Sequence, residues 1–102
     1  MRININPEDL ATVSAILQRI VPNHEVHAFG SRVKDTATEF SDLDLVVITQ
    51  QPLSLATYTE LCEAFSNSDL PFRVDILDWS VLSDHFKELI STQFLVIHQK
   101  HN

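Results

Sequence analysis

The stretch SDLDLVV at residues 41–47 decides the fold, because it predicts a strand with two unlike faces. Side chains two apart on a strand point to the same side, so Asp42 and Asp44 share one face and Leu43, Leu45 and Val47 share the other. Aspartate is depleted in strands. Two aspartates on one face repel each other by about 2–3 kcal/mol at ~6 Å and an effective dielectric constant of ~20.

Two interpretations account for that repulsion. Hard divalent cations with oxygen ligands offset it, and magnesium takes one or two carboxylates together with substrate phosphates. Alternatively, Asp42 and Asp44 occupy a solvated strand end, where water screens both charges. The stretch alone leaves both interpretations open.

A third aspartate lies in the stretch FRVDILDW at residues 72–79, which predicts another strand. Asp75 is flanked by Val74 and Ile76, so we expect a buried carboxylate that needs a partner or a metal ion. If this strand neighbours the one with Asp42 and Asp44, three carboxylates converge. Two of them could then bridge a pair of magnesium ions about 3.5–4 Å apart, which is the geometry for in-line phosphoryl displacement. Asp78 is expected to cap the next helix.

The chain contains one glycine, Gly30, where average usage would give about seven. It stands between an expected strand at residues 25–29 and a polar segment. Glycine permits a positive φ and lets another group approach the backbone closely. Ser31 follows with a hydroxyl and an N–H that both suit a phosphate oxygen. An isolated Gly-Ser is also common in plain turns, so this pair alone does not specify a site.

The remaining pattern predicts helix, strand, strand, helix, strand, helix, strand, which indicates an α/β or α+β fold with a mixed sheet. We expect one domain over residues 1–102. Asn6 and Pro7 open the first helix. Ser54 opens the second, and Ser80 or Ser83 the third. The buried stripes expected on the second and third helices are Leu55, Tyr58, Leu61, Cys62 and Phe65, and Phe86, Leu89 and Ile90. A last strand is expected at residues 94–98.

Composition narrows the class of protein. The chain has 102 residues, of which 44 % are hydrophobic, and a formal net charge of −7. The negative charge argues against direct binding of DNA or RNA, because phosphate neutralisation drives that affinity. Cys62 is the single cysteine, so no internal disulfide can form. The chain shows no signal peptide and no apolar run near the ~20 residues of a membrane span, so a cytoplasmic protein is expected.

Phe29-Gly30-Ser31, then Ser41-Asp42-Leu43-Asp44-Leu45, then Val74-Asp75-Ile76 resembles the signature of the DNA polymerase β-like nucleotidyltransferase superfamily. The chain looks closest to the minimal nucleotidyltransferase (MNT) group, whose members are about this short. The resemblance implies the nucleotidyltransferase fold, a small mixed β-sheet covered by helices.

The resemblance also implies roles for single residues. Gly30 and Ser31 would contact the triphosphate of ATP. Asp42 and Asp44 would hold two Mg²⁺ ions, and Asp75 would complete the metal site and act as general base. Arg32 would brace the triphosphate, with a surface role as the alternative.

One departure from the family pattern follows the Gly-Ser pair. Many relatives have a glycine where this chain has Lys34-Asp35-Thr36. We therefore expect a less compact loop. We also expect Asp35 to weaken nucleotide binding, because its charge lies near the phosphates.

MNT proteins commonly pair with a HEPN partner, an all-helical protein predicted to be an RNase toxin. The resemblance implies an antitoxin that transfers AMP from ATP to a tyrosine hydroxyl of that toxin, and the acidity of the chain suits a basic partner. Two alternatives remain open. The chain could neutralise a HEPN protein by binding alone, or it could be the catalytic subunit of an adenylyltransferase for a small hydroxylated molecule such as an aminoglycoside.

Overall fold

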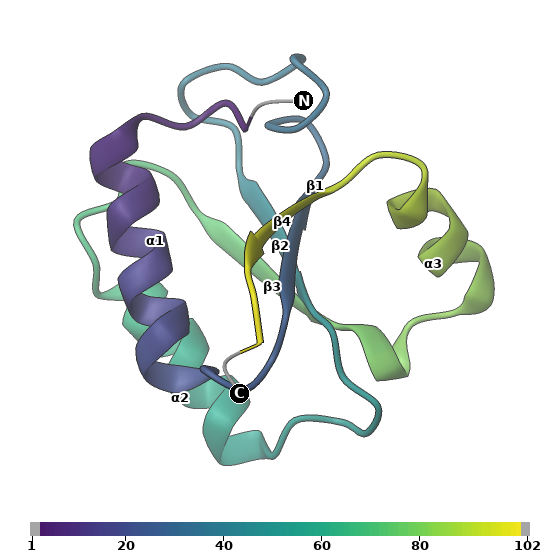
Figure 1. Cartoon of the computed structure of the whole chain (residues 1–102). Coiled ribbons are helices and arrows are strands. Elements are labelled where there is room, and N and C mark those ends of the chain that lie inside the picture. The colour runs from purple at the N-terminus through teal and green to yellow at the C-terminus, as the bar shows by residue number, and fades with distance from the viewer. Residues whose placement is uncertain (1–2, 101–102) are drawn as a thin grey trace.

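A four-stranded sheet forms the centre of the molecule in the computed structural model, which describes residues 3–100 (Figure 1). The strands are β1 (Val26–Phe29), β2 (Leu43–Val47), β3 (Val74–Asp78) and β4 (Leu95–His98). Their order in the sheet is β3-β2-β1-β4. β2 and β3 run parallel, whereas β1 is antiparallel to both β2 and β4. The predicted mixed sheet is confirmed.

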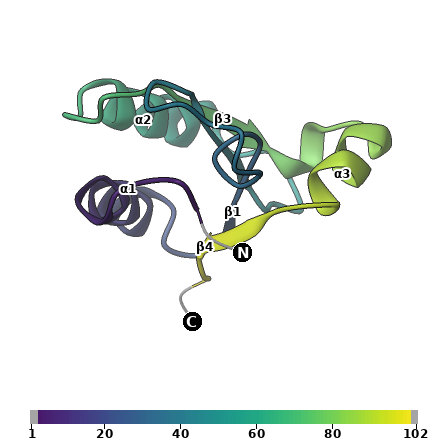
Figure 2. The ribbon, with the colours of Figure 1, turned by 90° about the horizontal axis from the view of Figure 1, so that it is seen from above.

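The helices lie on two sides of this sheet. α1 (Pro7–Ile20) and α2 (Leu55–Ser66) pack together on one side, and α3 (Asp84–Ser91) stands on the other (Figure 2). A short 3₁₀ helix, η1 (Trp79–Val81), joins β3 to α3. Among residues 3–100, no helix is both long enough and apolar enough to cross a bilayer.

Each α-helix begins at a polar side chain that accepts a hydrogen bond from the first turn. Asn6 accepts from the Asp9 amide at 2.8 Å, as the Asn6-Pro7 pair predicted. Ser54 accepts from the Thr57 amide at 3.1 Å. Of the two serines considered for the third helix, Ser83 takes this role, and Asp78 caps the preceding 3₁₀ helix.

The core lies between the sheet and the two helices α1 and α2. Leu43, Leu45 and Val47 of β2 are fully buried on this side. Their alternation with the aspartates matches the two-faced strand that the sequence predicted. The helices contribute further buried side chains, which include Val13, Ile16 and Leu17 from α1 and Leu61 and Phe65 from α2.

Four residues assigned to buried helix stripes are exposed instead. On α2, Leu55 in the first turn is 79 % exposed and Tyr58 is 38 % exposed. On α3, Leu89 is 54 % and Phe86 38 % exposed, and Ile90 is the one buried residue of that helix. Helical spacing identified the helices correctly but did not show how much of each stripe the rest of the molecule covers.

Asp78 ties the end of β3 to the segment between β2 and α2. Its carboxylate accepts hydrogen bonds from the Thr49 hydroxyl, from the Leu53 amide at 2.7 Å, and from the amide and hydroxyl of Ser80 at 3.0 and 2.8 Å. Burial would raise the pKa of Asp78. The hydrogen bonds from Thr49, Leu53 and Ser80 outweigh it, so the pKa lies below its ordinary value.

Asp78→Asn should therefore lower the free energy of unfolding by about 1–2 kcal/mol at neutral pH, because a charged acceptor of several hydrogen bonds is lost. A depressed carboxyl pKa contributes stability above the unfolded pKa and loses it as the pH falls through the folded pKa. The difference between wild type and variant should thus shrink below about pH 4. Urea denaturation at neutral and acidic pH measures both effects. An equal difference at both pH values would contradict this role.

Candidate active site

Strand register brings two of the predicted aspartates side by side. β2 and β3 run parallel, and Asp44 is the direct register partner of Asp75. Asp44 is also opposite Phe29, the last residue of β1, so Gly30 follows at the same end of the sheet. Direct register partners point to the same face. Asp44 and Asp75 therefore share a face, and Asp42 directly precedes β2 at this end.

The backbone at Gly30 lies against the carboxylate of Asp44. Gly30 has φ +80°, a conformation that favours glycine. A Cβ atom at this position would lie 2.3 Å from Oδ2 of Asp44 and 3.2 Å from its Cγ. The single glycine of the chain therefore serves two needs, a left-handed backbone and a close approach to a carboxylate.

The charges of the two neighbouring carboxylates act on Asp44. Burial raises the pKa of Asp44, and the charges of Asp75 and Asp42 raise it further. Asp75 is less enclosed than predicted, because its side chain is 43 % exposed. The expectation of a buried Asp75 was wrong because β3 is an edge strand with one neighbour.

Asp42, Asp44 and Asp75 offer carboxylate oxygens, which are the ligands that a hard divalent cation prefers. A cation beside Asp44 would also offset the neighbouring negative charges, which add to the effect of burial in raising the pKa of this residue. The arrangement is not preformed, however. Within residues 3–100, no three histidine, cysteine or carboxylate side chains are placed to hold a metal ion as they stand. Instead, Nη2 of Arg73 lies 3.1 Å from Oδ1 of Asp75. Asp75 therefore already has a cationic partner.

Arg32 has a different role from the one expected. It is 4 % exposed, and its guanidinium donates to the carbonyl oxygens of Asn4, Glu39 and Ser41 at 2.7–3.0 Å. The guanidinium also lies 4.2 Å from the ring centroid of Phe72. With its donors directed at the backbone, Arg32 holds the segment between β1 and β2 in place. Neither the triphosphate-bracing role nor the alternative surface role fits this geometry.

Arg32→Met should lower the free energy of unfolding by about 2–4 kcal/mol, because three carbonyl oxygens lose a charged donor. Urea denaturation measures the loss. Lys34→Met is the matched control, since Lys34 is exposed two residues away, and it should stay within about 0.5 kcal/mol of wild type. A loss of similar size in both variants would show that Arg32 acts by charge alone.

The segment after Gly30 is compact, contrary to expectation. Amides of Val33 and Lys34 donate to the Gly30 carbonyl, and amides of Lys34 and Thr36 donate to the Ser31 carbonyl. Asp35 adopts φ 60°, the left-handed conformation that glycine favours. Within the segment Lys34-Asp35-Thr36, aspartate therefore adopts a conformation that glycine would adopt without strain. Ser31 is half-buried at the start of this turn.

Aromatic side chains flank the carboxylates on the same face. His27 stacks on Phe94 with ring centroids 4.6 Å apart, and Phe29 meets Phe86 of α3 edge-on at 6.3 Å. The Phe29–Phe86 contact fastens α3 to the sheet beside Asp44. From the sequence, Phe29 was expected beside the site only as the residue before Gly30, and His27, Phe86 and Phe94 were not expected there. Phe29 of β1 is the direct register partner of Asp44 of β2, so the two side chains share a face. The sequence could have placed Phe29 at the site only if this register had been known.

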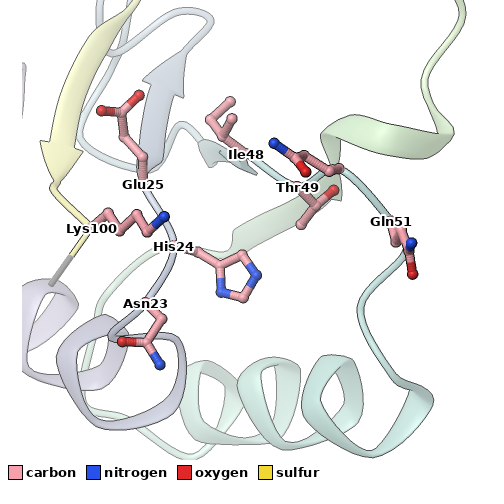
Figure 3. Close-up of a pocket in the computed structure, with 8 residues that line it drawn as sticks. Asn23, His24, Glu25, Ile48, Thr49, Gln51 and Lys100 are labelled. Atoms are coloured by element: carbon pink, nitrogen blue, oxygen red, sulfur yellow. The ribbon is translucent and has the colours of Figure 1, made fainter. Parts of the chain in front are cut away.

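A hollow lies at the opposite end of the sheet and is separate from the carboxylates. This pocket of about 570 Å³ is lined by residues that include His24, Thr49, Gln51 and Lys100 (Figure 3). Nδ1 of His24 is buried there without a hydrogen-bond partner among the described residues. The lining comes from the start of β1, the segment after β2 and the residues after β4. None of the aspartates of the site contributes to it.

Residues 10–98 match the nucleotidyltransferase domain family. The chain belongs to this family. It is 50 % identical over 99 residues to a protein of Haemophilus influenzae named probable protein adenylyltransferase MntA, with 97 % of this chain and 87 % of the relative covered. The resemblance to minimal nucleotidyltransferases is therefore confirmed, and nucleotidyl transfer is the reaction class of the family.

Solved structures share the fold. A candidate minimal nucleotidyltransferase is 29 % identical, with a TM-score of 0.69 and coverage of 89 % of this chain and 95 % of that chain. A chain of a toxin–antitoxin complex with AMP-PNP is 22 % identical, with a TM-score of 0.74 and coverage of 91 % and 75 %. A chain from the complex of tri-AMPylated Shewanella oneidensis HEPN toxin with MNT antitoxin has a TM-score of 0.65 at 22 % identity and covers 88 % and 69 %.

Proposed function

We propose that this chain transfers AMP from ATP to a hydroxyl group of a HEPN-type protein and so acts as the antitoxin of a toxin–antitoxin pair. The observation that carries the proposal is the register of Asp44 and Asp75 beside the close backbone approach at Gly30. The 50 % identity to the Haemophilus influenzae protein over nearly the whole chain supports protein as the acceptor.

Asp42, Asp44 and Asp75 would hold two Mg²⁺ ions, which would polarise the phosphoryl oxygens and offset the charge of the triphosphate. Gly30 leaves space for the phosphates beside the backbone. Ser31 would orient them through its hydroxyl and its N–H. The acceptor oxygen attacks the α-phosphorus and pyrophosphate leaves. The acceptor proton passes to Oδ2 of Asp75, the oxygen that Arg73 does not contact.

The net negative charge of the chain supports a positively charged protein as its partner. The chain has 14 acidic and 7 basic side chains. An acidic surface favours association with a basic partner and disfavours nucleic acid as a direct ligand. A HEPN protein that binds RNA would provide such a basic surface.

The test is the mass of a co-purified HEPN-type protein from the same genome after incubation with the chain. A gain of one or more AMP units that requires both ATP and Mg²⁺ is the expected result. Tandem mass spectrometry should place the modification on a hydroxyl, with tyrosine as the residue expected. No gain in mass, with a stable complex formed, would reject transfer and leave neutralisation by binding alone.

A further inference from the structure

Arg73 contacts one carboxylate of the site, that of Asp75. Its Nη2 lies 3.1 Å from Oδ1 of Asp75, and among residues 3–100 no other lysine or arginine forms an ion pair with Asp42, Asp44 or Asp75. Arg73 and Asp75 are two residues apart, so both side chains extend from the same side of the β3 segment.

The backbone of Arg73 is fixed whereas its side chain is free to move. Its carbonyl accepts from the Leu43 amide at 2.8 Å, which anchors the residue beside the start of β2. The side chain is 78 % exposed, so no packing holds the guanidinium against Asp75. An exposed ion pair of this kind contributes little and exchanges easily. A competing cation could therefore replace the guanidinium at small cost.

We propose that Arg73 is a positioning residue that neutralises Asp75 in the metal-free protein, and that a divalent metal ion must displace its guanidinium to bind. This inference rests on the proposed metal-dependent transfer at the same site. It explains why the carboxylates are near one another without being arranged to hold an ion. Oδ1 of Asp75 is turned to the guanidinium, and the ion can use that oxygen once Arg73 leaves.

Displacement also has a consequence for the order of binding. In the absence of nucleotide, Arg73 competes with the metal ion and lowers its affinity. When a triphosphate delivers the ion, the negative charge of the phosphates attracts the released guanidinium, whose donors match phosphate oxygens. Arg73 would therefore disfavour the bare ion and favour the ion that arrives with nucleotide.

The test is a titration of the nucleotide-free chain with Mn²⁺. The electron paramagnetic resonance signal of the free ion measures how much Mn²⁺ remains unbound. Arg73→Gln should lower the half-saturating Mn²⁺ concentration about two- to fivefold, the range expected for an exposed ion pair. Arg73→Lys should restore most of the wild-type value, because it keeps the charge. Arg19→Gln removes the same charge from an exposed position on α1 and should leave binding unchanged.

Asp44→Asn distinguishes failure of the proposed metal site from failure of the proposed role of Arg73. If wild type binds Mn²⁺ and Asp44→Asn does not, the metal site is in place. Unchanged or weaker binding by Arg73→Gln would then overturn the role of Arg73 alone. If wild-type binding is unaffected by Asp44→Asn, the aspartates do not hold the ion and both proposals fail. Thermal denaturation should show Arg73→Gln folded as stably as wild type, since the side chain is exposed.

Discussion

Asp44→Asn is expected to reduce AMP transfer on the order of a thousandfold or more, while the chain still binds its HEPN-type partner. Asp44 is the carboxylate closest to the Gly30 backbone and the register partner of Asp75. Loss of its charge removes a metal ligand that acts on the developing charge of the transition state. Single groups in that role contribute factors of about 10²–10³ or more. The rate of AMP incorporation into the partner measures the loss.

The same substitution should stabilise the chain. Burial and the charges of Asp75 and Asp42 raise the pKa of Asp44, so the ionised side chain is unfavourable in the folded protein at neutral pH. Asparagine removes that charge with little change of shape. Asp69→Asn is the control, because Asp69 is exposed between α2 and β3, and it should leave both activity and stability unchanged. Full activity of Asp44→Asn would contradict the catalytic role.

The parts of the site that followed from sequence are those governed by local geometry. Strand parity placed Asp42 and Asp44 opposite the buried leucines, and that pattern depends only on the two-residue repeat of a strand. The lone glycine indicated a positive φ, which the structure has at Gly30. The helix caps at Asn6 and Ser54 were likewise local, since each cap bonds within its own first turn.

The parts that did not follow depend on contacts between distant segments. Arg32 is buried because Asn4, 28 residues earlier, and Phe72, far along the chain, meet it in space. No local pattern contains that information. Asp75 is half-exposed because β3 is an edge strand, and strand order is a property of the whole sheet. Arg73 was recognisable in principle from its two-residue spacing to Asp75, but only once the register placed Asp75 beside Asp44.

Gly30→Ala is expected to abolish transfer and to lower the free energy of unfolding by at least about 1–2 kcal/mol, the cost of a left-handed residue with a Cβ. The new Cβ would lie 2.3 Å from Oδ2 of Asp44. Because the clashing atom is the end of a side chain, the carboxylate can rotate away. That rotation moves Asp44 from its place beside Asp75, so activity falls even if the fold survives. AMP incorporation and urea denaturation measure the two effects.

A double-mutant cycle separates clash from backbone strain. In the background of Asp44→Gly the carboxylate is absent, so Gly30→Ala should then cost only the strain of φ +80°. Asp35→Gly is the control for strain alone, because Asp35 is exposed and already has a Cβ at φ 60°, so glycine there should recover the strain that alanine adds at Gly30. If Gly30→Ala costs the same stability in both backgrounds, the Asp44 carboxylate rotates away at no cost and only the backbone strain opposes the substitution. Full AMP transfer by Gly30→Ala would contradict the prediction, because Asp44 would then not need its place against the Gly30 backbone.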